Sequence, residues 1–159
     1  MPTKRVLRLL SVAAIAPLLL TSCDSNNPFD PSDDAAGTYS LTIYADRSVP
    51  VTFPCDPGQC GLTNGGTFRV NDGTIVLSRN GTFVETNHYT TTPSGGSAQP
   101  TTFHSEGTYE IFGDQIEFYA PPQNGFDERI FNGIFEYADD DIRISYEEDG
   151  ATYEYIRPS

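Results

Sequence analysis

Residues 104–120 have the sequence HSEGTYEIFGDQIEFYA, in which Gly113-Asp114 separates two alternating runs of apolar and polar residues. A glycine that comes first in a two-residue loop is typical of a type II′ turn, whose backbone twist matches that of the flanking strands. Pairing across this turn sets Glu110 against Glu117 on a polar face. The opposite, apolar face carries Tyr109, Ile111, Ile116 and Phe118. The stretch therefore predicts a half-buried antiparallel hairpin.

Turn dipeptides separate similar short runs along the rest of the chain. Asp72-Gly73 predicts a type I′ hairpin between residues 67–71 and 74–78, with Val70 opposite Ile75. Asp149-Gly150 predicts another hairpin near the C-terminus. Its cross-strand pairs are Tyr146 with Tyr153 and Ile144 with Tyr155.

Asn80-Gly81 allows two different turns. A two-residue turn aligns Leu77 with Val84, whereas a three-residue turn with a bulge at Gly81 aligns Leu77 with Phe83. We prefer the second turn because it buries the larger side chain.

The expected strands form a series of sequential hairpins. They cover residues 37–45, 50–54, 67–71, 74–78, 82–92, 101–112, 115–120, 129–137, 142–147 and 151–157. Nineteen aromatic residues, 14 Gly and 12 Pro fit β-structure with frequent turns. Eight to ten strands in this order favour an all-β fold, an antiparallel up-and-down β-barrel, with a β-sandwich as the alternative.

Fourteen apolar or aromatic side chains are expected to point into this barrel, where they line a ligand cavity or fill it. They are Tyr39, Leu41, Phe68, Leu77, Tyr109, Ile111, Ile116, Phe118, Phe131, Phe135, Ile144, Tyr146, Tyr153 and Tyr155.

The first 23 residues have the pattern of a signal peptide. Basic Met1–Arg8 is followed by apolar Leu9–Leu20, a run too short to span a bilayer, which needs about 20 residues. Leu20-Thr21-Ser22-Cys23 resembles the lipobox of bacterial lipoproteins. The resemblance implies that residues 1–22 are removed and that Cys23 is acylated, which anchors the protein to the lipid bilayer of a bacterial cell envelope. The membrane and its side stay open, and the alternative is an ordinary secretory peptide with a chance cysteine.

Residues 23–36 are expected to be the acylated Cys23 followed by a flexible acidic tether. Asp24–Ala36 is polar and interrupted by proline, so it cannot bury enough apolar surface to order itself. A flexible segment of this length has a root-mean-square reach of about 20 Å. The barrel domain is expected to cover residues 37–159.

Cys55 and Cys60 flank a Pro-Gly turn. In an oxidising compartment such a pair indicates a disulfide. The alternative is a redox or metal pair, but the spacing is not Cys-x-x-Cys and no other metal-ligating residues accompany it.

Four short motifs together resemble bacterial lipocalin-like lipoproteins over roughly residues 37–157. They are Gly37-Thr38-Tyr39, Asn80-Gly81-Thr82-Phe83, Gly107-Thr108-Tyr109-Glu110-Ile111 and Tyr153-Glu154-Tyr155-Ile156-Arg157. The resemblance implies a membrane-anchored lipoprotein whose barrel binds a small hydrophobic ligand. True lipocalins carry Trp where Tyr39 stands, and this chain has no Trp. The alternative is a filled barrel that acts, without a ligand, as a structural or protein-interaction module of the cell envelope.

Charge and motif content exclude several functions. The chain has a formal net charge of −13, and from Cys23 onward six Arg and 22 acidic residues give −16. Such a surface repels nucleic acid and anionic headgroups, so we expect no nucleic-acid partner. The sequence shows no hydrolase elbow, phosphate loop or nucleophile–base constellation, so we expect neither an enzyme nor a cofactor. Protein partners are not indicated.

Three groups of residues are alternatives for a metal site, although we expect none to bind a metal. His88 and His104 face each other if the loop at residues 93–100 is symmetric about residue 96, with Glu106 nearby. Glu110 and Glu117 form a carboxylate pair, for which a solvated outer face is the expected environment. Acidic residues 139–141 are expected to form a turn.

Overall fold

The computed structural model describes residues 34–122, 127–138 and 140–158. Ten antiparallel strands form one sheet within these residues. They are β1 (Gly37–Tyr44), β2 (Arg47–Ser48), β3 (Val51–Cys55), β4 (Gly66–Leu77), β5 (Thr82–Pro93), β6 (Gln99–Phe112), β7 (Gln115–Ala120), β8 (Arg129–Ala138), β9 (Asp141–Glu148) and β10 (Ala151–Pro158). Among the described residues, no helix is long and apolar enough to cross a lipid bilayer.

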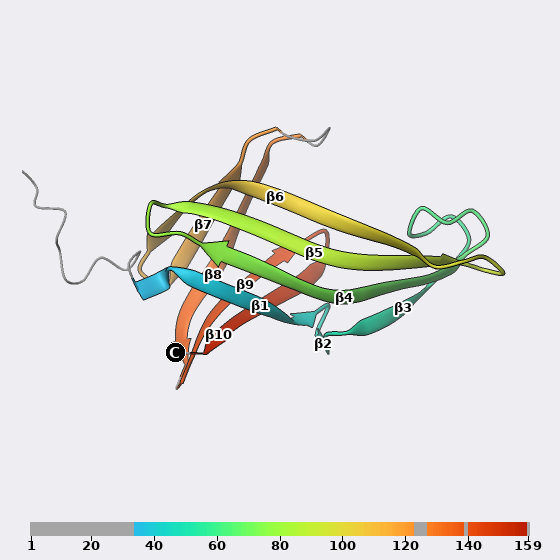
Figure 1. Ribbon diagram of the computed structural model, residues 1–159, viewed down its shortest axis with the longest axis horizontal. Helices are drawn as coiled ribbons and strands as arrows, with labels where there is room; N and C mark the ends of the chain where they lie inside the picture. The colour runs from blue at the N-terminus through green and yellow to red at the C-terminus, as the bar shows by residue number, and fades with distance from the viewer. Residues whose placement is uncertain (1–33, 123–126, 139, 159) are drawn as a thin grey trace, which may run out of the picture.

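Eight of the described strands, β1 and β4–β10, close into an up-and-down barrel (Figure 1). The sheet runs from β1 through β10 and back in chain order to β4, and Gly37–Ser40 of β1 then pairs with Thr74–Leu77 of β4. The predicted all-β, up-and-down barrel is therefore confirmed. Its topology follows chain order, because each strand of β4–β10 pairs with its neighbour in the sequence, and two-residue turns join β6 to β7 and β9 to β10.

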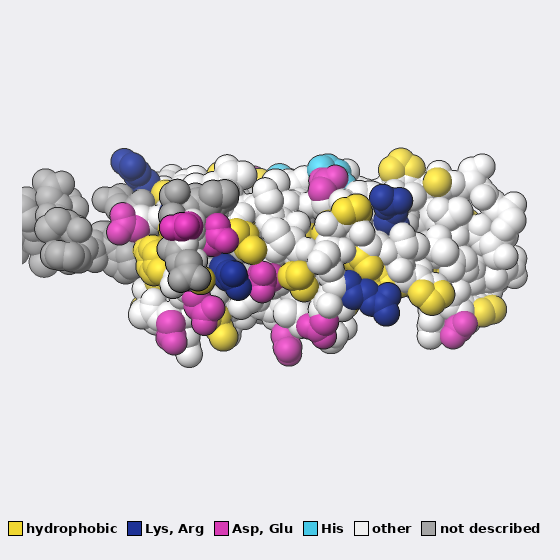
Figure 2. Space-filling view, turned by 90° about the horizontal axis from the view of Figure 1, so that it is seen from below, with side chains coloured by type: hydrophobic (Ala, Val, Ile, Leu, Met, Phe, Trp, Pro, Cys, Tyr) yellow, Lys and Arg dark blue, Asp and Glu magenta, His cyan; other side chains and the backbone are white. Residues whose placement is uncertain are grey.

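Two short strands lie outside this closed circuit. β2 pairs with the end of β1, and β3 pairs with Val70 and the residues before it on β4. The first half of β4 and the adjoining halves of β5 and β6 continue past the barrel with β3, and we call this extension the arm (Figure 1). In Figure 2, Asp and Glu side chains gather over the barrel half of the visible face, while the arm is mostly uncharged.

The predicted disulfide between Cys55 and Cys60 is confirmed, and it lies at the end of β3.

The central hairpin has the predicted register. Glu110 faces Glu117, Ile111 faces Ile116, and Gly113 in the turn has a φ of 69°. Ile116 is fully buried, whereas both glutamates are exposed. The alternation of side chains across the strands thus assigns the apolar face to the barrel interior and the acidic face to solvent.

Aromatic rings fill much of that interior. The Phe118 ring stacks on Phe131 at 4.5 Å between ring centroids and meets Phe83 edge-on at 5.0 Å. Both geometries are favourable for aromatic pairs.

The preferred three-residue turn at Asn80-Gly81 is confirmed, because Phe83 pairs with Leu77 across a loop in which Gly81 has a φ of 77°.

The prediction of a hairpin at Asp72-Gly73 is wrong. β4 continues through this dipeptide, with only a bulge between Val70 and Asp72. Gly73 is buried and faces Asn87, and a Cβ placed on Gly73 would overlap the Asn87 side-chain oxygen. The glycine therefore permits a close approach inside the barrel, one of the roles of glycine within a strand.

The chain before β1 is attached to the barrel wall as far back as Asp34. The Tyr39 hydroxyl donates a 2.5 Å hydrogen bond to the carbonyl of Ala35, which is fully buried. The Arg157 guanidinium on β10 donates to the carbonyls of Ala36 and Asp34. The predicted signal peptide and Cys23 lie outside the described residues, as does most of the predicted tether.

Candidate functional site

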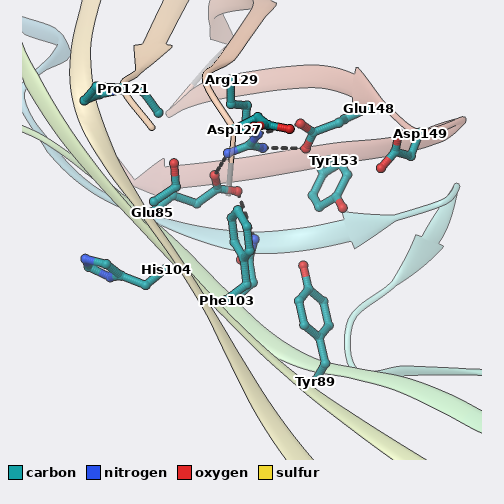
Figure 3. A pocket seen from close by; sticks show the side chains of 13 residues that line it. Glu85, Tyr89, Phe103, His104, Pro121, Asp127, Arg129, Glu148, Asp149 and Tyr153 are labelled. Atoms are coloured by element: carbon teal, nitrogen blue, oxygen red, sulfur yellow. Dashed lines mark hydrogen bonds and ion pairs between the residues drawn. The ribbon is translucent and has the colours of Figure 1, made fainter. Parts of the chain in front are cut away.

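A pocket of about 350 Å³ opens at the end of the barrel beside the loop that follows β7 and the β9–β10 turn (Figure 3). We call it the barrel-end pocket. It is lined by Glu85, Asn87, Tyr89, Phe103, His104, Ser105, Ala120, Pro121, Asp127, Arg129, Glu148, Asp149 and Tyr153. Charged and aromatic side chains thus meet at one place beside the apolar core of the barrel.

Strand alternation brings the polar groups into this interior. Phe83 points into the core from β5, so Glu85 and Asn87, two and four residues later, point the same way. Arg129 precedes Phe131 by two residues on β8, and Glu148 follows Tyr146 by two residues on β9.

Glu85 is completely buried and accepts four hydrogen bonds. The donors are the hydroxyls of Tyr146 at 2.5 Å and Tyr155 at 3.0 Å, the side-chain amide of Asn87 at 2.9 Å, and Nη1 of Arg129 at 2.5 Å. An ionised carboxylate only accepts hydrogen bonds and offers about four positions for them. Three of the four donors bond to Oε1 and Arg129 bonds to Oε2, so protein groups hold both oxygens of the buried carboxylate.

Arg129 connects Glu85 to the rim of the pocket. Its Nε and Nη2 donate to the two carboxylate oxygens of Glu148, each at 2.5 Å. Its guanidinium also lies 4.0 Å from the centroid of the Phe131 ring. Burial lowers the pKa of Arg129, but the hydrogen bond to Glu148 and the charge of Glu85 outweigh it, so the pKa lies above its ordinary value. The side chain is a permanent cation held between two carboxylates.

The tyrosines around the pocket retain their protons at neutral pH. Burial raises the pKa of Tyr146 and of Tyr155 well above 10, and the negative charge of Glu85 raises both further. Burial also raises the pKa of Tyr89 to about 12, an effect that a hydrogen bond with Tyr153 partly opposes. These hydroxyls can therefore act as donors in the network.

The mouth of the pocket is acidic. Asp127 and Asp149 are exposed, and the Glu148 side chain is 28% exposed. With Glu85, the lining contains four carboxylates and one guanidinium, a formal charge of −3 with His104 neutral. Figure 3 shows Asp127, Glu148 and Asp149 on the same side of the cavity, with the hydroxyls of Tyr89 and Tyr153 directed toward each other.

The fourteen residues predicted to line or fill the barrel have different positions. Tyr153 lines the barrel-end pocket, and Phe68 and Ile111 are half-buried against the core. The remaining eleven are buried in the core: Tyr39, Leu41, Leu77, Tyr109, Ile116, Phe118, Phe131, Phe135, Ile144, Tyr146 and Tyr155.

The alternative in which His88 faces His104 is wrong. His88 faces Thr102 and His104 faces Thr86, because the β5–β6 hairpin is centred on residue 95 and not on residue 96. Both histidines are exposed, with Asp72 2.6 Å from His88 and Glu106 3.7 Å from His104. Within the described parts of the chain, no group of three or more His, Cys, Asp or Glu side chains has the arrangement of a metal site.

The polar network was not predicted from the sequence. The signal was nevertheless present, because a buried Phe83 requires Glu85, Asn87 and Tyr89 to share its face.

No protein-family model, curated protein or solved structure matches this chain.

Proposed function

We propose that this protein is a lipid-anchored bacterial envelope lipoprotein whose barrel binds a small molecule in the barrel-end pocket, without catalysing a reaction. The observation that carries the proposal is the pocket itself, about 350 Å³ beside a core of buried apolar side chains. Ligand sites of proteins begin at about 300 Å³ and are usually formed before the ligand arrives. The hydrogen bonds of Glu85 and Arg129 hold the walls of this one in place.

The lining favours a ligand with an apolar part and a polar end. Rings of Tyr89, Phe103 and Tyr153 offer apolar contact, while Glu148 and the exposed Asp149 offer hydrogen-bond acceptors. A wholly apolar ligand would remove these carboxylates from water without replacing their hydrogen bonds, which is unfavourable. The hydrophobic ligand implied by the lipocalin-like resemblance therefore needs a polar group here.

The anchoring part of the proposal depends on Leu20-Thr21-Ser22-Cys23. Acylation of Cys23 with more than one chain would give stable attachment to a bilayer, whereas one chain would give only reversible attachment. The domain would then lie at the surface of a bacterial envelope membrane, within reach of small molecules on that side.

A second candidate is a barrel without a ligand that serves as a structural or interaction module of the envelope. The core favours it, since eighteen buried residues between Ala35 and Tyr155 in the sequence form a single cluster. In that case Glu85 and Arg129 would only stabilise the barrel end.

Mass spectrometry of small molecules extracted from the purified full-length protein separates these candidates. Ala120→Phe places a ring in the barrel-end pocket, whereas the matched control Tyr119→Phe changes an outward-facing residue on the same strand. We expect a stoichiometric small molecule in the wild type and in Tyr119→Phe, and its loss in Ala120→Phe. Thermal melts would show that the variants remain folded, because overpacking costs about 1–3 kcal/mol. A molecule that persists in Ala120→Phe, or that no preparation contains, would contradict the proposal.

A further inference from the structure

The charge of the barrel-end pocket restricts the ligand that it can take. Arg129 is the only arginine or lysine among the lining residues, which all belong to the described part of the chain. Each of its three guanidinium nitrogens already donates to a carboxylate, Nη1 to Glu85 and the other two to Glu148. An anionic ligand would therefore have to share the guanidinium with two carboxylates and would meet a lining with a formal charge of −3.

The three carboxylates at the mouth can accept more hydrogen bonds from a ligand than the one buried carboxylate inside can. Glu85 is completely buried and already accepts four hydrogen bonds from the protein, so it offers a ligand less than the exposed carboxylates do. Glu148 uses one face of its carboxylate for Arg129 and is partly exposed, while Asp127 and Asp149 are exposed at the rim. These three groups lie on one side of the cavity in Figure 3. A positively charged ligand group there would gain charge-assisted hydrogen bonds.

The aromatic rings that line the pocket also favour a positively charged ligand group. Ammonium and guanidinium groups are attracted to the faces of aromatic rings within about 6 Å of the centroid. The protein already uses this contact at the site, since the Arg129 guanidinium lies 4.0 Å from the Phe131 centroid and 5.2 Å from that of Phe103. Tyr89 and Tyr153 present two further rings to the cavity.

We propose that the barrel-end pocket selects small organic cations, namely amines that carry an apolar group, with the ammonium at Glu148 and Asp149 and the apolar group against Phe103, Tyr89 and Tyr153. This inference depends on the proposed ligand-binding function and specifies its substrate class. The protein is then a receptor or carrier for amines at the envelope surface.

Three probes of nearly equal size test the charge selection: benzylamine, benzyl alcohol and benzoate. Binding of each to the full-length protein would be measured by isothermal titration calorimetry at pH 7 and low ionic strength. We expect benzylamine to bind about tenfold or more tightly than benzyl alcohol, a difference of about 1.4 kcal/mol, and benzoate to bind most weakly. Added salt should weaken the binding of benzylamine and leave that of benzyl alcohol unchanged.

Two variants locate the binding. Asp149→Asn removes one charge at the mouth. It should weaken the binding of benzylamine severalfold without affecting the binding of benzyl alcohol. The control Asp114→Asn removes an exposed charge at the β6–β7 turn, outside the pocket, and should have no effect. Ala120→Phe should abolish binding of both probes, which distinguishes the pocket from the acidic surface.

The outcomes separate this inference from the proposed function. Equal affinity for the three probes, or a preference for benzoate, would overturn the cation selection and leave ligand binding intact. Benzylamine binding that survives Ala120→Phe would overturn it too, by assigning the amine to the general acidic surface. Absence of binding by all three probes, together with no extracted small molecule, would overturn both.

Discussion

Replacing Glu85 with Gln tests whether the buried network holds the barrel end. The substitution keeps the size of the side chain but removes its charge, and it turns one acceptor group into an amide donor. Four donors, from Asn87, Arg129, Tyr146 and Tyr155, converge on the present carboxylate. Gln cannot accept from all of them, so at least one buried donor loses its partner.

The expected loss of stability follows from this geometry. Removing one member of a buried ion pair costs about 3–5 kcal/mol, because the other charge stays buried. Here Arg129 keeps Glu148, which places the expected cost near the lower value, about 3 kcal/mol. For a domain of this size, that corresponds to a decrease in melting temperature of roughly 10 °C.

Thermal and urea denaturation of the purified protein, followed by circular dichroism, would measure the change. Glu117→Gln is the matched control, since Glu117 is exposed on the outer face, and its effect should stay within about 0.5 kcal/mol. If Glu85→Gln melted together with this control, the carboxylate would not be holding the four donors and the account of the pocket walls would be refuted.

Three further predictions depend on the fold, and one depends on the lipobox sequence. Ile116→Ala should destabilise the protein by about 2–5 kcal/mol in urea denaturation, whereas Glu117→Lys should be neutral or slightly stabilising; the opposite result would reverse the two faces of the hairpin. Gly73→Ala should also lower the urea midpoint, since the added methyl group has no room beside the side-chain amide of Asn87. An unchanged midpoint would disprove that close packing. Cys23→Ala should leave the precursor unacylated and uncut at this site, and mass spectrometry that detected acylated mature protein would rule out the lipobox. Burial raises the pKa of Tyr89 from about 10 to about 12, so the folded state keeps a proton that the unfolded chain loses, and stability should fall as the pH rises from about 10 through 12; melts that are constant over this range would contradict it.

Local turn chemistry predicted most of the barrel. Gly113-Asp114, Asn80-Gly81 and Asp149-Gly150 all lie at hairpin turns, and the predicted pairs Ile111–Ile116, Leu77–Phe83 and Tyr146–Tyr153 are present. These features depend on residues close in sequence, so the strand period and the turn residue define them together.

The wrong expectations concern residues whose role depends on contacts with residues far away in the sequence. The local sequence around Gly73 is that of a turn. The residue is instead a glycine inside a strand because the side chain of Asn87, on another strand, leaves no room for a Cβ. The alternative in which His88 faces His104 depended on the symmetry of one loop, and a shift of its centre by one residue separates the two rings. Neither fact can be obtained from the local pattern of side chains.

The barrel-end pocket was missed because polar residues were assigned to the outside. Alternation from Phe83 places Glu85 inside, but a buried carboxylate is stable only with partners, and these come from β5, β8, β9 and β10. Only the closed barrel brings Asn87, Arg129, Tyr146 and Tyr155 together, so the site is a product of the tertiary structure.

The closure between β1 and β4 has a consequence for how the barrel opens. Only Gly37–Ser40 of β1 pairs with β4, whereas β4 and β5 pair along nearly their whole lengths. β1 pairs with β10 over a similarly short stretch that a bulge interrupts. Local opening takes least free energy where few backbone hydrogen bonds must break. Backbone amides of β1 should therefore exchange with deuterium before those of β4 and β5, which makes the strand joined to the N-terminal segment the first part of the wall to open.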